Sequence, residues 1–73
     1  MNTIVASWDH SKEKGEIHLN LDSRFFDKET RRSMAQKKVE ELEAQFDPDS
    51  VEVMLVHARS LDDFKTNDPR FLP

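Results

Sequence analysis

The chain contains no cysteine and no tyrosine, and glycine occurs only once in its 73 residues. Without cysteine, neither a disulfide nor a thiolate metal site can form. A single glycine cannot build a glycine-rich phosphate-binding loop. No apolar run approaches the ~20 residues that a membrane-spanning helix needs. The opening stretch "MNTIVASWDH" has no charged leader before an apolar core, so we expect no signal peptide.

Charged residues are as frequent as hydrophobic ones, at 36% each, and the net charge is -4. A chain of this length buries only about 60% of the surface that it exposes when unfolded, so its core must be thin. We therefore expect one small domain. The acidic balance also argues against a general nucleic-acid-binding protein, which usually carries a basic excess.

Two runs of alternating apolar and polar residues, 3–9 and 16–21, predict two strands, each with one buried face. Gly15 lies between them, and we interpret it as the residue of a hairpin turn that needs a positive φ. Alternation predicts that the buried faces carry Ile4, Ala6 and Trp8 on the first strand and Ile17, Leu19 and Leu21 on the second.

A helix is expected after Asp27, whose carboxylate can accept a hydrogen bond from a free N–H of the first turn. Its apolar stripe has helical spacing and consists of Ala35, Val39, Leu42 and Phe46. Pro48 ends the helix because it disfavours helical backbone at Asp47. The alternating segment 50–59 predicts a third strand, and Ser60 is expected to cap one short helical turn after it.

These elements predict the α+β fold class: a three-stranded antiparallel sheet in the order 2-1-3, with one helix packed on one face, in the chain order ββαβ. We expect residues 1–66 to form this single domain. Residues 67–73 are expected to form a flexible C-terminal tail, unless Phe71 and Leu72 dock on the domain.

Candidate catalytic groups are few in this chain. His10, His18 and His57 are scattered, with no i, i+4 pair and no cysteine to complete a metal site. The serines have no neighbouring nucleophile motif, and a two-layer domain of this size leaves little room for a ligand pocket of ~300 Å³ or more. We therefore expect a non-enzymatic protein with no catalytic residue, no metal and no cofactor.

The expected helix carries its charges in an order that opposes its dipole. Basic residues come first and acidic ones follow, although a helix has a positive amino end and a negative carboxyl end. One interpretation is a set of exposed local ion pairs such as Glu29–Arg32, each worth about 0.3–0.5 kcal/mol and without function. The other is a bipolar surface whose basic end meets an acidic partner. The basic residues before and within the first half are Arg24, Lys28, Arg31, Arg32, Lys37 and Lys38.

The sheet also has a second face. If the face that carries Trp8 lies under the helix, the opposite face presents Val5, Met54 and Val56 outward. Scattered apolar residues are normal on protein surfaces. The alternatives are a docking patch, covered by the C-terminal tail or by a partner, and a sheet edge that accepts an added peptide strand.

The size of the chain, its opening "MNTIVASWDH" and its close "NDPRFLP" resemble those of small phage-encoded proteins that bind bacterial RNA polymerase. These proteins include a transcription inhibitor and antiterminator of a Xanthomonas phage. The resemblance implies a regulator that binds the amino terminus of the polymerase β′ subunit, near the β flap and the RNA exit channel. It also implies inhibition of initiation at host promoters by disfavouring σ, and read-through of intrinsic terminators with NusA as a helper.

On this hypothesis the chain is a monomer when free, acts in the host bacterial cytoplasm away from membranes, and contacts β′ and β, with NusA and nascent RNA as further contacts. Charge and expected exposure predict the following partner-binding residues: Arg24, Lys28, Arg31, Arg32, Trp8, Met54 and Val56. Two alternatives stay open. One is a small nucleic-acid-binding module, whose affinity would fall steeply with salt. The other is an acidic nucleic-acid mimic that inhibits a host enzyme through Glu40, Glu41 and Glu43.

Overall fold

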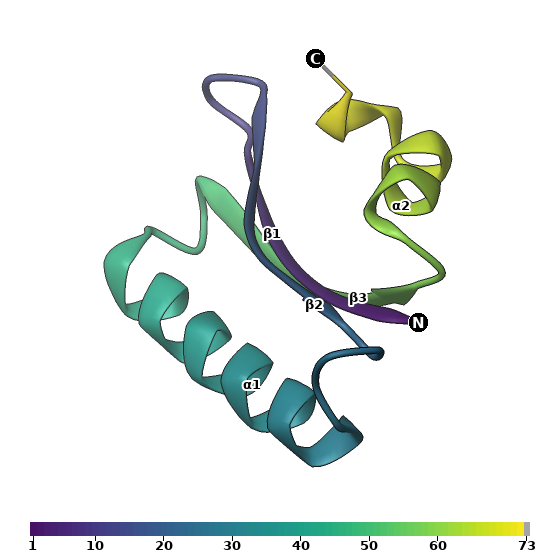
Figure 1. The fold of residues 1–73 in the computed structure, drawn as a ribbon. Coiled ribbons are helices and arrows are strands. Elements are labelled where there is room, and N and C mark those ends of the chain that lie inside the picture. The colour runs from purple at the N-terminus through teal and green to yellow at the C-terminus, as the bar shows by residue number, and fades with distance from the viewer. Residues whose placement is uncertain (73) are drawn as a thin grey trace.

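The computed structural model describes residues 1–72, in which one antiparallel sheet lies between helices on its two faces (Figure 1). The strands are β1 (Asn2–Asp9), β2 (Lys14–Asp22) and β3 (Val51–Ala58). The helices are α1 (Lys28–Gln45), α2 (Leu61–Asn67) and the 3-10 helix η1 (Pro69–Phe71). The sheet order is β2-β1-β3, and β1 runs antiparallel to both neighbours. The predicted α+β class and strand order are confirmed.

The helix ends follow from local side-chain chemistry. Asp27 caps α1, because its carboxylate accepts a hydrogen bond from the Thr30 N–H at 2.8 Å. Ser60 caps α2 in the same way and accepts from the Asp63 N–H at 3.0 Å. Helix α1 ends at Gln45, before the proline-containing turn. Both predicted caps are confirmed.

Each face of the sheet has its own apolar cluster. Helix α1 lies against the first face, where the cluster contains Val5, Ala35 and Leu42, with Leu19, Val39, Phe46 and Val53 packed around them. Helices α2 and η1 lie against the second face, where the cluster contains Ile4, Ala6, Phe64 and Phe71, with Trp8, Ile17, Met54, Val56, Ala58 and Leu61 around them. The predicted apolar stripe of α1 is confirmed, but the single core expected between one helix and the sheet is divided into two.

The orientation expected for β1 is wrong, whereas the orientation expected for β3 is confirmed. Val5 is fully buried under α1, whereas Trp8 lies on the opposite face. Met54 and Val56 lie on the face away from α1, as expected, and α2 and η1 cover that face, which is the C-terminal alternative that we named for this patch. Both faces of the central strand are apolar, so alternation alone does not indicate which face a given helix covers.

A bulge in β2 also changes the predicted pattern. Val5 pairs with Leu19 and Ala6 pairs with Ile17, so His18 has no partner on β1. As a result Ile17 and Leu19, two residues apart, lie on opposite faces of the sheet. Strict alternation would have placed them on the same face.

The C-terminal segment docks on the sheet through Phe71, which is the alternative that we named to a flexible tail. The Phe71 side chain is only 7% exposed, and its ring lies 5.0 Å from the Phe64 ring and 6.4 Å from the Trp8 ring, measured between centroids. Arg70 holds the same segment, since its guanidinium lies 5.4 Å from the Trp8 ring centroid. Pro73 lies outside the described residues.

The role predicted for Gly15 is wrong. The residue with positive φ in the β1–β2 turn is Glu13, at 52°, and Gly15 has ordinary extended backbone within β2. What Gly15 provides is space. A Cβ atom at this position would lie 2.7 Å from Cδ1 of Phe71 and 3.1 Å from the Arg70 carbonyl oxygen, so η1 can approach β2 only where no side chain intervenes.

Gly15→Ala is therefore expected to lower the free energy of unfolding by about 1–3 kcal/mol, the usual cost of overpacking a filled contact. Equilibrium urea unfolding measures this change. The control is a double-mutant cycle with Phe71→Ala. In the Phe71→Ala background the added methyl group should cost clearly less, because the ring that it meets most closely is gone. Equal costs in both backgrounds would contradict the close approach of η1.

Candidate functional site

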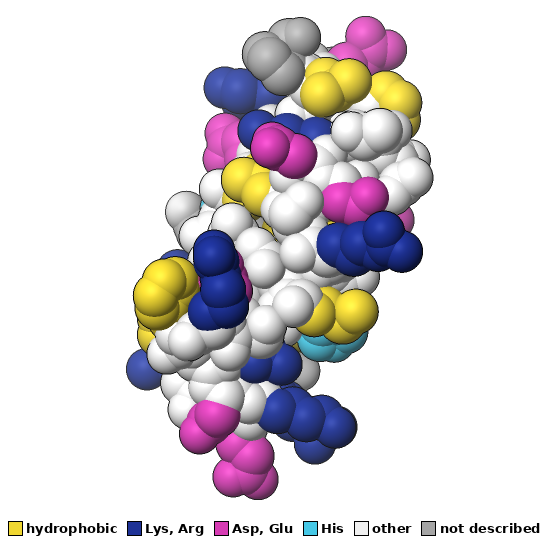
Figure 2. Space-filling model, turned by 45° about the vertical axis from the view of Figure 1, so that its right-hand side comes forward, with side chains coloured by type: hydrophobic (Ala, Val, Ile, Leu, Met, Phe, Trp, Pro, Cys, Tyr) yellow, Lys and Arg dark blue, Asp and Glu magenta, His cyan; other side chains and the backbone are white. Residues whose placement is uncertain are grey.

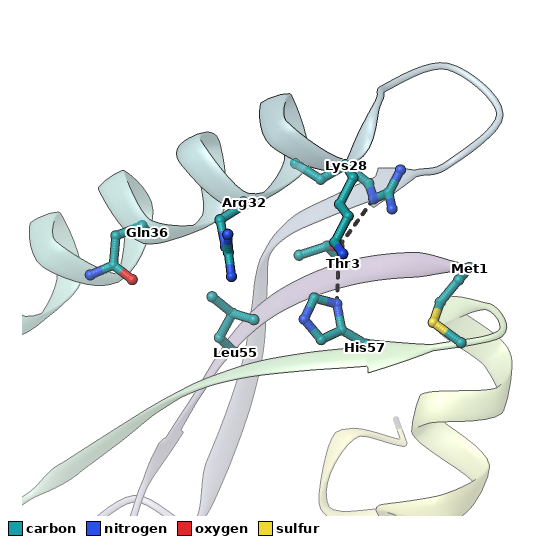
Figure 3. Close-up of a pocket in the computed structure, with 8 residues that line it drawn as sticks. Met1, Thr3, Lys28, Arg32, Gln36, Leu55 and His57 are labelled. Carbon is teal, nitrogen blue, oxygen red and sulfur yellow. Dashed lines mark hydrogen bonds between the residues drawn. The ribbon is translucent and has the colours of Figure 1, made fainter.

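A pocket of about 410 Å³ lies between the first half of α1 and the edge strand β3, and we call it the α1–β3 pocket (Figure 3). Our expectation that the domain has little room for a pocket of ~300 Å³ or more is therefore wrong. Its lining residues are Met1, Thr3, Lys28, Arg31, Arg32, Gln36, Leu55 and His57. None of the eight is acidic, and three carry a permanent positive charge. In the space-filling view, basic side chains, a histidine and a hydrophobic side chain adjoin on the lower part of one face (Figure 2).

The spacing of residues along α1 and β3 brings these side chains together. Lys28, Arg32 and Gln36 are four residues apart, so they follow one another along a single side of the helix. Leu55 and His57 are two residues apart on β3 and therefore share one face of the strand. Figure 3 shows Lys28 and Arg32 extending from α1 toward the space above Leu55 and His57.

Arg31 is a structural residue of this pocket. Its Nη1 donates to the Phe26 carbonyl oxygen at 2.6 Å, and its Nε donates to Thr3 Oγ1 at 3.3 Å. Thr3 is almost completely buried, and its Oγ1 also lies 3.2 Å from Nδ1 of His57. Arg31 therefore holds the start of α1 against β1, and Phe26 is tied to the helix through its backbone.

Lys28 and Arg32, on either side of Arg31 in the helix, are exposed. Within residues 1–72 neither side chain comes within 4.0 Å of a carboxylate, and the expected Glu29–Arg32 pair is absent from that range. The ion pair that α1 does contain is Lys38–Glu41, at 3.2 Å. Glu29 is the acidic residue of the first turn, and the last turn has no basic residue. The unfavourable charge order thus leaves two cations available at the pocket.

Arg24 does not line the α1–β3 pocket, and it is already paired. Its Nη2 lies 2.6 Å from Oδ2 of Asp22 and its Nε donates to the same oxygen, while the guanidinium lies 5.5 Å from the Phe25 ring centroid. Phe25 itself is 76% exposed and does not reach the core. The hydrogen bonds from Arg24 lower the pKa of Asp22 to about 2. Arg24 therefore stabilises the loop before α1.

The three apolar residues predicted to bind a partner are not part of this pocket. Trp8 is half-buried between Phe71 and Arg70, and Met54 and Val56 are half-buried on the same face. The structure thus brings together Lys28, Arg31 and Arg32 of the predicted binding residues, and it places Arg24, Trp8, Met54 and Val56 elsewhere. Leu55 and His57 were missed, because alternation assigns them to the face under α1 but does not show that they lie beside Lys28 and Arg32.

A serine–histidine pair was also missed. Ser7 Oγ on β1 lies 2.7 Å from His18 Nε2, and the His18 ring lies 6.3 Å from the Phe46 ring, measured between centroids. Glu16 Oε2 lies 3.9 Å from the same Nε2. In a catalytic triad the carboxylate holds the other ring nitrogen, so this cluster lacks triad geometry. The contact between Ser7 and His18 gives the buried Ser7 hydroxyl a hydrogen-bond partner. The bulge at His18 makes this contact possible.

No cluster of three or more His, Asp or Glu side chains suited to a metal ion occurs in the described residues 1–72. In the same range, no helix combines the length and the apolar character that crossing a bilayer requires. Comparison of the chain with protein-family models, curated proteins and solved structures found no match.

The Arg24–Asp22 pair predicts a pH dependence. A lowered pKa means that Asp22 stabilises the fold fully above its ordinary pKa of 3.8, and that this contribution is lost as the pH falls toward about 2. Carbon-detected NMR titration of the Asp22 side-chain carboxyl group should give a pKa of about 2. In the Arg24→Ala variant the pKa of Asp22 should rise toward 3.8. The control is the pKa of Asp68, which Arg70 lowers and which should stay unchanged in this variant. A wild-type Asp22 that titrates at its ordinary pKa would contradict the pair.

The charge order of α1 predicts a stabilising substitution. Lys28→Glu places a negative charge at the positive end of the helix and breaks no ion pair among residues 1–72, so it should raise the free energy of unfolding by about 0.3–1 kcal/mol. Urea unfolding at low ionic strength measures this, and the gain should shrink in high salt. Lys12→Glu, in the β1–β2 turn, is the matched control and should change stability little. A clear loss of stability in Lys28→Glu would show that Lys28 has a structural role.

Proposed function

We propose that this chain is a non-enzymatic phage transcription regulator that binds host RNA polymerase in the bacterial cytoplasm. On this proposal it binds the β′ amino terminus, near the β flap and the RNA exit channel. There it inhibits initiation at host promoters by disfavouring σ, and it promotes read-through of intrinsic terminators together with NusA.

The observation that carries the proposal is that Lys28 and Arg32, which have no ion-pair partner among residues 1–72, lie beside Leu55 in the α1–β3 pocket. Their place near the amino end of α1 opposes helix stability, and residues that lower stability are often retained for binding. The resemblance of the opening and closing stretches to polymerase-binding phage proteins supplies the identity of the partner. A charged, partly apolar surface of this kind fits a protein contact, since interface cores are apolar and their rims are polar.

Capture and transcription assays test the proposal. Immobilised protein is expected to retain β and β′ from purified core polymerase. Added to holoenzyme, it should reduce initiation at host promoters, and added to elongating polymerase it should increase read-through of an intrinsic terminator. Lys28→Glu combined with Arg32→Glu should weaken capture by at least about tenfold, because a charge that attracted an acidic surface now repels it.

The matched control is Lys12→Glu combined with Lys14→Glu. It makes the same change in net charge in and beside the β1–β2 turn, at the opposite end of the sheet, and should retain capture and both transcription effects. Unchanged transcription with wild-type protein would overturn the proposal. Retention of free RNA or DNA alone, with an affinity that falls steeply with salt, would favour the nucleic-acid-binding module instead.

A further inference from the structure

The open edge of β3 lies directly beside the two unpaired cations. β3 pairs with β1 and with no other strand among the described residues. The His10 N–H donates to the Ser50 carbonyl at 2.9 Å, and these two residues continue the register in which Asp9 faces Val51. Hydrogen-bonded pairs alternate in an antiparallel ladder, so the even-numbered residues of β3 bond to β1.

The odd-numbered residues of β3 therefore point their N–H and C=O groups away from the sheet. The other side of β1 agrees with this assignment, because the Ser23 N–H donates to the Met1 carbonyl and the odd residues of β1 thus bond to β2. Leu55 and His57 belong to the outward set. The same two residues direct their side chains into the α1–β3 pocket. Backbone and side-chain groups of β3 thus meet at one site.

We propose that the edge of β3 accepts an extended, acidic segment of the partner protein as a fourth strand, lying below Lys28 and Arg32. This inference rests on the proposed function only for the identity of the partner. Side chains on one face of a strand recur every ~6.8 Å, and residues four apart on a helix recur every ~6 Å. Alternate residues of an added strand would therefore meet Lys28, Arg32 and Gln36 in turn, with acidic side chains opposite the two cations.

Charge and composition favour this occupant over the others. A second copy of the chain adding through its own β3 would present valine, leucine and histidine side chains on this face, and would bring the cations of the two copies together. Single-stranded nucleic acid is bound on aromatic platforms, and the pocket lining has no aromatic side chain except the His57 imidazole. An acidic strand satisfies both the open backbone groups and the unpaired charges.

The test uses the full chain and a synthetic probe, so that it does not depend on the polymerase. The probe is an acetylated, amidated peptide of alternating valine and glutamate residues, seven residues long, and the comparison peptide carries lysine in place of glutamate. NMR titration should shift the Leu55 and His57 amide signals with the glutamate peptide only, and should slow their hydrogen exchange. Lys28→Gln combined with Arg32→Gln should weaken binding by about tenfold.

Removal of single backbone donors separates strand addition from simple charge attraction. Chemical synthesis can supply the protein with an N-methylated Leu55 amide, which removes one outward N–H and keeps the side chain. This variant should bind the glutamate peptide about tenfold more weakly. N-methylation of Asn20, whose N–H points outward on the β2 edge by the same alternation, is the matched control and should leave binding unchanged. Equal binding by the Leu55 variant, or self-association through β3, would overturn the proposal.

Core polymerase then separates this inference from the proposed function. Loss of capture on Leu55 N-methylation would support strand addition as the mode of polymerase binding. Peptide binding at the β3 edge without any capture of polymerase would refute the proposed partner while supporting the edge as a site for acidic strands. Capture that survives Leu55 N-methylation unchanged would overturn strand addition as the way in which polymerase is bound.

Discussion

The burial of β1 on both faces is the constraint on which the rest of the fold depends. Every residue from Asn2 to Ser7 is buried, so a chain of 73 residues must cover two sides of its sheet. The long helix α1 covers one side. The short α2 and η1 cover the other, through Phe64 and Phe71. The central position of β1 also means that its buried polar side chains need hydrogen-bond partners. Among residues 1–72, every buried side-chain nitrogen and oxygen has such a partner.

Those polar contacts also decide which charges remain free. Thr3 on β1 accepts a hydrogen bond from Arg31, which is thereby held against the sheet. Lys28 and Arg32 remain exposed over β3 on either side of it. The basic end of α1 therefore consists of one structural arginine and two cations that are available to a partner. Helix stability gives no reason for the place of these two cations, and the proposed function gives one in partner binding.

With both faces covered, the edges of the sheet are the surfaces at which β-strand backbone can still bind a partner. The two edges differ. Helix η1 packs on the face of β2 at Gly15, while the β3 edge is bordered by the α1–β3 pocket with its basic side chains. On the proposed function, a small regulator with one such edge and a separate acidic helix end could touch two parts of a large enzyme at once. Two weak contacts on one rigid body bind more tightly than either contact alone.

The sequence by itself determined the local elements of this protein. The cap at Asp27, the cap at Ser60 and the apolar stripe through Ala35 and Leu42 involve residues close together in the chain, so their patterns could be read directly. The basic end of the candidate site could be read in the same way, from Lys28 and Arg32. Strand order followed from the short connection of β1 to β2 and the helical crossover to β3.

Only the tertiary structure decided what each face packs against. The bulge at His18, the docking of Phe71 on Gly15 and the partner of Arg31 all join residues far apart in the chain. Alternation assigns residues to two faces but does not say which residues of α1 a given strand residue meets, and for that reason Leu55 and His57 could not be placed in the site from their pattern. Local interactions thus determine which elements form, and long-range packing determines where they meet.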